Sequence, residues 1–178
     1  REDLNVMKQN TERLLNLTNQ LLDFRKTESQ GFRLNFAKCN ITEVLKETHV
    51  RFTSLAKQKG LEFTLQVPEK DFYAHVNQEA FTKIISNLLN NGMKYAESYV
   101  HVMLEIPETD DDNLFRIRTV NDGVIIPDAM KEEIFKPFVR FNEQEDGKVT
   151  TGTGIGLALS RSLAEFHLGR SEEHTSEL

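Results

Sequence analysis

The chain has 178 residues, 38% of them hydrophobic, and 22 Lys and Arg against 28 Asp and Glu give a formal net charge of −6. This length fits about one globular domain with a short accessory element. The acidic balance argues against bulk electrostatic binding to nucleic acid or to an anionic membrane. The single cysteine excludes an internal disulfide framework and a cysteine-based metal cluster. No apolar run approaches the roughly 20 residues of a transmembrane helix.

A helix is predicted over residues 4–24. Its apolar residues Leu14, Leu17, Leu21 and Phe24 are spaced by three, four and three, which is typical of a coiled coil or a helix bundle. A lone helix of this length is marginal in water, so we expect its apolar stripe to be buried against partners. It is either a core helix of one domain or an oligomerising helix, and its place at one end of the chain favours the second interpretation.

Short strands and helices follow without strict alternation, which indicates an α+β fold. We predict a two-layer α/β sandwich with one mixed sheet and helices on one face. Asn40 or Thr42 can cap the second helix, and Gly60 ends it. The acidic run 108–113 is predicted to be a hairpin loop rather than a metal site. The predicted strands are 33–39, 61–67, 72–76, 99–106 and 114–120, and the predicted helices are 41–59, 77–96 and 155–166.

Four polar residues share one face of the helix predicted over 77–96. Asn87, Asn91, Lys94 and Tyr95 stand at i, i+4, i+7 and i+8. Amides are poor residues for a helix interior, so this row suggests a ligand that offsets their cost. An amide oxygen suits Mg²⁺, a lysine suits phosphate and a tyrosine offers an aromatic wall. Taken alone, the row could equally be the polar outer face of an amphipathic helix.

Two glycine-containing stretches could also carry chemistry. Asp122, at a strand end, can accept a hydrogen bond from an exocyclic amine, and Gly123 frees the backbone to turn, although a simple turn explains this pair equally well. Gly152, Gly154 and Gly156 precede an apolar helix whose backbone N–H groups can meet phosphate oxygens. A lone glycine-rich loop is weak evidence, and this one lacks the ending of a P-loop and follows no strand.

Together and in this order, the three stretches resemble the N, G1 and G2 boxes of the sensor histidine kinase catalytic domain. The segment Ile134-Phe-Lys-Pro-Phe138 resembles the F box of that family. The resemblance covers roughly residues 41–169. It implies the helix-on-sheet ATP-binding fold that gyrases, mismatch-repair ATPases and heat-shock chaperones share, with ATP and Mg²⁺ as the expected cofactors.

The resemblance also implies roles for individual residues. Asn91 would ligate the Mg²⁺ that bridges the ATP phosphates, and Asn87 would support the site from one turn earlier. Lys94 would reach phosphate, and Tyr95 would pack near the adenine. Asp122 would accept a hydrogen bond from the adenine amino group.

Further residues are assigned in the same way. Arg140 matches a lid arginine that contacts the terminal phosphate in some family members, so Asn87, Lys94 and Arg140 are the expected catalytic residues. Residues 142–151 would be the mobile ATP lid. The remaining expected nucleotide-binding residues are Gly123, Ile126, Gly152, Thr153, Gly154, Gly156 and Leu157.

Two positions depart from the family pattern. Gly92 stands where the N box usually has Ala, which mainly lowers helix propensity. Ile125 stands where the G1 box often has a second glycine, and binding is still expected because the Asp122-Gly123 pair is intact.

The resemblance divides the chain into three parts. Residues 1–31 are similar to the second helix of the dimerisation domain, which packs as a four-helix bundle in a homodimer. Residues 32–169 would be the ATP-binding catalytic domain, with the last strands of its sheet missing. Residues 170–178 are similar to the translation of a sequencing-adapter oligonucleotide, so we expect them to be non-native; the alternative is a divergent polar tail. None of the five histidines has the sequence context of a phosphoacceptor.

The implied function is transfer of the ATP γ-phosphate to a histidine on the dimerisation domain, for relay to an aspartate of a response regulator receiver domain. The chain would belong to the cytoplasmic portion of a membrane-anchored sensor, would have no nucleic-acid partner and would not phosphorylate itself without the missing phosphoacceptor helix. Asn87 stands where related hydrolysing ATPases place a Glu, and an amide cannot act as a general base. The alternatives are an ATP-driven conformational clamp, an anti-sigma Ser/Thr kinase and a nucleotide-sensing pseudokinase.

Overall fold

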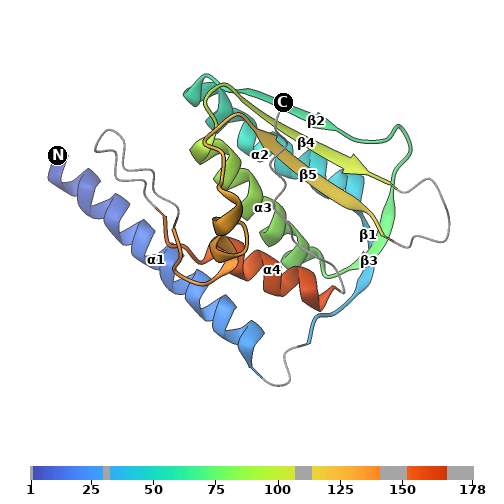
Figure 1. The fold of residues 1–178 in the computed structure, drawn as a ribbon, viewed down its shortest axis with the longest axis horizontal. Helices are drawn as coiled ribbons and strands as arrows, with labels where there is room; N and C mark the ends of the chain where they lie inside the picture. Colours follow the sequence, from blue (N-terminus) through green and yellow to red (C-terminus); the bar gives the residue numbers. More distant parts are fainter. Residues whose placement is uncertain (1, 30–32, 107–113, 141–151, 168–178) are drawn as a thin grey trace.

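The computed structural model describes residues 2–29, 33–106, 114–140 and 152–167. Figure 1 shows a sheet on one side of the molecule, helices beneath it and a long first helix across the far side. The helices are α1 (Glu2–Glu28), α2 (Ile41–Lys59), α3 (Gln78–Tyr95) and α4 (Gly156–Phe166), with short 3-10 turns η1 (Asp128–Met130) and η2 (Glu133–Phe135). The strands are β1 (Ala37–Asn40), β2 (Glu62–Gln66), β3 (Tyr73–Val76), β4 (Tyr99–Glu105) and β5 (Arg116–Asn121).

The strands form two hydrogen-bonded ladders rather than the single predicted sheet. The larger has the order β2-β4-β5, in which β2 and β4 are parallel and β4 and β5 antiparallel, so it is mixed as predicted. The smaller is the antiparallel pair β1-β3. A parallel pair needs a long crossover, and β3 with α3 supplies the one between β2 and β4.

The main core lies between the larger ladder and helices α2 and α3, which cover one face of it (Figure 1). Alternate residues of β4 point into this core because successive side chains of a strand face opposite sides. Burial of apolar surface is the main force that holds helices to sheet. The most deeply buried residues of this core include Ile41, Leu45, Ile85, Leu89 and Val102.

The capping residues position the helices almost as predicted. Asn40 is the cap of α2, because its side chain accepts a hydrogen bond from the Glu43 N–H at 3.2 Å. Thr42, the other candidate, accepts from the Phe72 N–H instead. Gly60 ends α2 in the left-handed conformation, with φ +71°, and its N–H donates to carbonyls of the last turn.

The strand predicted over residues 33–39 was wrong in its first half, since β1 begins only at Ala37. Leu34 packs against the apolar cluster that α3 and α4 share. The Phe36 ring makes an edge contact with His167, with centroids 5.2 Å apart, and the Asn35 carbonyl accepts from the Asn77 side chain. The alternation of this segment therefore reflects packing against the helices and not pairing in a sheet.

Helix α1 is confirmed, but its predicted apolar stripe is divided between two environments. Phe24 packs against the cluster formed by α3 and α4, so this end of α1 is part of the folded core. Leu14, by contrast, is 65% exposed, and Leu15, Leu21 and Leu22 are exposed as well. Within the described ranges, no helix combines the length and the hydropathy needed to cross a membrane.

The left-handed cap at Gly60 gives a prediction about stability. A side chain added there would meet no atom within 4 Å, so any cost of Gly60→Ala comes from the backbone conformation alone. We expect the free energy of unfolding in urea to fall by about 1 kcal/mol. Gly60→Asn should lose less, because Asn tolerates this conformation better. Equal stability of all three proteins would contradict the assignment.

Candidate functional site

The polar face of α3 meets the glycine-containing turn before α4. The Asn87 amide nitrogen donates to the Gly156 carbonyl and to the Ser160 hydroxyl, both at 3.1 Å. A Cβ added to Gly156 would lie 3.7 Å from the Asn87 side chain, so the two helices are in close contact at this point. These contacts bring together two stretches that the sequence separates by more than sixty residues.

Lys94 makes the second contact between α3 and the turn. A Cβ placed on Gly152 would lie 2.9 Å from the Lys94 Nζ, so the ammonium group lies directly against this glycine. The same nitrogen donates to the Tyr95 hydroxyl at 2.7 Å and lies 4.3 Å from the centre of the Tyr95 ring. A positive charge, an aromatic ring and a glycine backbone are thus gathered at the C-terminal end of α3.

Asp122 holds the loop between α3 and β4. Its carboxylate accepts from the backbone N–H groups of Glu97, Ser98 and Tyr99, at 3.0 to 3.2 Å, and from the Ser98 hydroxyl. The hydrogen bonds from Ser98 are the largest cause that holds the pKa of Asp122 well below its ordinary value of 3.8. The carboxylate therefore stays ionised and remains an acceptor. Its predicted bond to adenine stays a prediction.

Gly123 is required by a close approach of two backbone segments. A Cβ at this position would lie 2.0 Å from the Tyr95 carbonyl oxygen, a distance that no side chain permits. Gly92 has a related explanation, since a Cβ there would lie 3.1 Å from a Val100 methyl group. Its departure from the family alanine therefore concerns packing of α3 on the sheet as well as helix propensity.

The F-box segment is tied to the same turn. The Phe138 N–H donates to the Gly154 carbonyl at 2.9 Å, and both residues have positive φ. Ile134 and Phe135 are buried, and the Arg161 guanidinium lies 4.0 Å from the centre of the Phe135 ring. Arg140 is exposed at the end of a described range, and the predicted lid over 142–151 lies outside the described residues.

The described residues fit a Mg²⁺ ion that a nucleotide helps to hold. Among them, no group of three or more His, Cys, Asp or Glu side chains could bind a metal ion, and the acidic run 108–113 lies outside them. Asn91 is half-buried on α3, one turn beyond Asn87. Mg²⁺ usually takes few ligands from the protein and keeps waters and phosphate oxygens as the others. One amide oxygen therefore suits this ion, and an all-protein cage is unnecessary.

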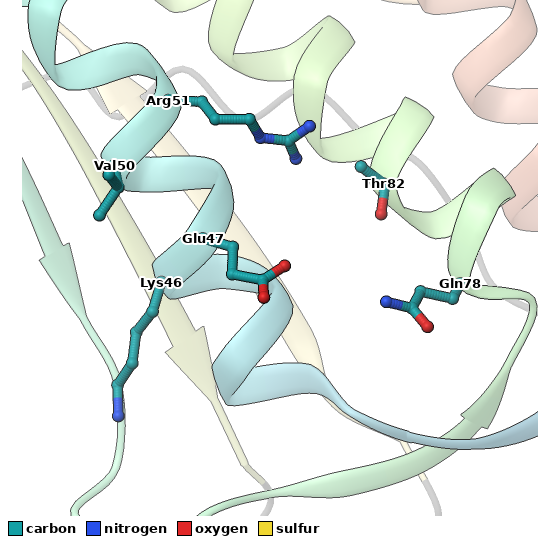
Figure 2. Close-up of a pocket in the computed structure, with 6 residues that line it drawn as sticks. All are labelled: Lys46, Glu47, Val50, Arg51, Gln78 and Thr82. Carbon is teal, nitrogen blue, oxygen red and sulfur yellow. The ribbon is translucent and has the colours of Figure 1, made fainter.

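Two surface grooves lie among the described residues, and only one of them reaches this junction. One, of about 660 Å³, lies between α2 and α3; Figure 2 shows Arg51 and Glu47 pointing into it from α2, opposite Gln78 and Thr82. It contains none of the predicted site residues. A second, of about 340 Å³, lies between α1 and α3 and includes Asn87.

The comparison with protein families decides the assignment. The model of the histidine kinase-, DNA gyrase B- and HSP90-like ATPase family matches residues 76–177. The chain belongs to this family. The matched range contains Asn87, Asn91, Asp122 and the glycines of the candidate site, and the mixed sheet and long first helix agree with the histidine kinase form of the fold.

The chain is similar to several sensor kinases. It is 29% identical to sensor histidine kinase WalK of Bacillus subtilis over 93% of this chain and 27% of that protein. It is 31% identical to histidine kinase P4 of Formosa agariphila over 92% of this chain and 12% of that protein. The chain thus spans about a quarter or less of the length of these relatives, and the part they share includes the catalytic ATPase domain of a sensor kinase.

Solved structures confirm the fold. Full-length ShkA in complex with AMPPNP matches with a TM-score of 0.76 at 21% identity, over 93% of this chain and 34% of that one. The catalytic domain of histidine kinase ThkA matches with a TM-score of 0.62 at 24% identity, over 74% of this chain and 81% of that one. At these identities the likeness concerns the fold alone.

Sequence reasoning missed two serines of this site. Ser160 is fully buried and completes the tie between Asn87 and α4. A serine one turn after Gly156, directly after the apolar run Leu157-Ala-Leu159, was the available signal. Ser98, which donates to Asp122, had none, because a serine in a helix-to-strand loop is ordinary.

The Asp122 contacts predict a pH-dependent contribution to stability. Asp122→Asn should lower the melting temperature at pH 7, because three backbone N–H groups lose an anionic acceptor. A carboxylate with a lowered folded pKa contributes stability above its unfolded pKa and loses it as the pH falls. The difference in melting temperature between the two proteins should therefore shrink below about pH 4.

Asp128→Asn is the matched control. Asp128 also has a lowered pKa, but its cause is an ion pair with Lys131 at an exposed site. Such pairs are screened by salt, so we expect this variant to match the wild type in 0.5 M NaCl. A difference for Asp122→Asn that stays constant from pH 7 to pH 3 would contradict the assigned contacts.

Proposed function

We propose that the chain is the catalytic part of a two-component sensor histidine kinase that binds Mg-ATP and transfers its γ-phosphate to a histidine of a dimerisation domain. The observation that carries this proposal is the meeting of three distant stretches at one place, with the Lys94 ammonium group against Gly152. A cation beside a glycine turn at a helix N-terminus is an arrangement suited to phosphate.

The phosphate end of the nucleotide would lie between α3 and the turn from Gly152 to Gly156. Lys94 would shift from Tyr95 towards phosphate oxygens, while the backbone N–H groups at the start of α4 supply further donors. Asn91 would offer its amide oxygen to Mg²⁺, which neutralises phosphate charge when bound. Arg140, Thr153 and Leu157 stay proposed members of this end of the site.

The adenine end would lie at Asp122, with Gly123, Ile126 and Tyr95 around it. The carboxylate already accepts several hydrogen bonds from the loop after α3, so an adenine amine would be an additional donor to an anion that is held in place. Preorganised acceptors of this kind cost little to align on binding. We propose that Asp122 both holds this loop and recognises the base.

Asn87 supports phosphoryl transfer over ATP hydrolysis. Its amide nitrogen is committed to Gly156 and Ser160, so the side chain is fixed against α4. An amide cannot take a proton from water, and the described contacts use it as a structural donor. The task left to the domain is positioning and charge stabilisation, as phosphoryl transfer to another protein group requires. This argues against the conformational clamp ATPase.

The exposed leucines of α1 support a place for this helix in a dimeric bundle. Leu14, Leu15, Leu21 and Leu22 are exposed on a helix of 27 residues, a cost that a second copy of the chain could offset. We propose residues 1–31 as dimerisation helix and 32–169 as catalytic domain. We propose that this catalytic portion is the cytoplasmic part of a membrane-anchored sensor, whose phosphoacceptor helix would receive the phosphate and pass it to the receiver domain of a response regulator.

The expectation that residues 170–178 are non-native stays a prediction. The family model matches as far as residue 177, so the match does not separate this segment from the catalytic domain. These residues lie outside the described ranges.

Asn91→Ala tests the metal role directly. We expect calorimetric titration with ATP to show that Mg²⁺ strengthens binding to the wild type and not to the variant, because the amide ligand is lost. Asn90→Ala is the control, since Asn90 directly precedes Asn91 on α3 and its side chain is exposed. An Asn91→Ala protein whose affinity still responds to Mg²⁺ like the wild type would overturn the role.

The chain alone should not label itself with phosphate. After incubation with radiolabelled ATP and Mg²⁺, no acid-labile phosphate should be retained, because none of its five histidines has the context of a phosphoacceptor. ATP binding measured on the same sample shows that the site is intact. Stable acid-labile labelling would show that the phosphoacceptor lies in this chain.

A further inference from the structure

Helix α1 forms a hydrogen bond with the glycine turn through the Gln20 side chain. The Thr153 hydroxyl donates to the Gln20 side-chain oxygen at 2.8 Å, and both residues are half-buried. The same hydroxyl oxygen accepts from the Ile155 N–H at 3.3 Å. A residue of the first helix is therefore bonded to the middle of the proposed phosphate site, across 133 positions of sequence.

Neighbouring contacts hold Gln20 in this place. Asp23, one turn further along α1, forms an ion pair with Lys83 of α3 at 2.9 Å. Phe24 packs against the cluster that includes Ile155 and Leu159. Residues 20, 23 and 24 share one face of α1, because positions three and four apart are neighbours on a helix. This face is docked on α3 and α4, and Figure 1 shows α4 beginning beside α1.

The docked arrangement withholds the Thr153 hydroxyl proton from a phosphate. A hydroxyl has a single proton, and in Thr153 it is given to Gln20. The Ile155 N–H, at the start of α4, points to the Thr153 oxygen rather than out of the turn. Both groups belong to the turn where backbone and hydroxyl donors would meet phosphate oxygens.

We propose that Gln20 competes with the phosphates of ATP for the Thr153 hydroxyl of this turn, so that docking of α1 and nucleotide binding oppose each other. This inference rests on the proposed function, since it requires ATP at the glycine turn. Gln20 is a positioning residue that acts through the Thr153 hydroxyl. Because coupling between two binding events is reciprocal, ATP should loosen α1 by the same factor by which docked α1 weakens ATP binding.

A double-mutant cycle tests the competition. Gln20→Met keeps the length and helix propensity of the side chain and removes the strong acceptor, so the fold is not at risk. We expect Gln20→Met to bind Mg-ATP about 2- to 10-fold more tightly, the range of one released hydrogen bond. In a Thr153→Val background the same change should have no effect, because no hydroxyl remains to be released.

Two further variants separate this effect from general changes in structure. Thr153→Ser keeps the hydroxyl, so in this background Gln20→Met should again strengthen Mg-ATP binding, as it does in the wild type. Thr18→Ala is the control on α1, since the exposed Thr18 side chain bonds to the carbonyl of Leu14 in its own helix. It should bind Mg-ATP like the wild type.

Hydrogen exchange gives the reciprocal measurement. Saturating Mg-AMPPNP should speed amide exchange in residues 16–24 of the wild type and leave it unchanged in Gln20→Met. A wild type that binds no Mg-ATP overturns the proposed function and this inference together. A wild type that binds, with a Gln20→Met affinity that is unchanged, weaker or equally raised in the Thr153→Val background, overturns this inference alone.

Discussion

The bond from the Asn87 amide to Gly156 and Ser160 is the contact on which the geometry of the site depends. It joins α3, which is fixed by its apolar face on the sheet, to α4, which follows the glycine turn. Together with the hydrogen bond from Phe138 to Gly154, this contact fixes the position of the turn relative to Lys94. A buried polar tie of this kind favours one arrangement of the two helices, since an unpaired Ser160 or Asn87 would be costly there.

The second constraint is the close approach of backbone segments around Asp122 and Gly123. The carboxylate gathers the N–H groups after α3, and the glycine lies against the Tyr95 carbonyl, so the end of β5 and the end of α3 are locked together. Stability and ligand geometry therefore share the same atoms. In a catalytic domain that works by positioning, this sharing is expected, because a rigid site loses little entropy on binding.

The fold was largely predictable because its signals are local. Asn40 and Gly60 cap α2 at the expected positions, and the alternation of β4 marks its buried face. The separation into two ladders and the late start of β1 could not be predicted, since both depend on contacts with distant helices. For the site, the order of the three motifs along the chain was enough to predict that these stretches act together. The tie to Ser160, the Ser98 contact and the bond from Gln20 needed three-dimensional structure, because no spacing rule links these residues.

The central claim is that ATP binds where α3, the glycine turn and the Asp122 loop meet. Backbone amide NMR shifts of the isotopically labelled chain, recorded during titration with Mg-ATP, test it most directly. The account predicts the largest shifts at residues 91–95, 122–123 and 152–156. The largest shifts at Lys46–Arg51 and Gln78–Thr82, along the groove of Figure 2, would contradict it.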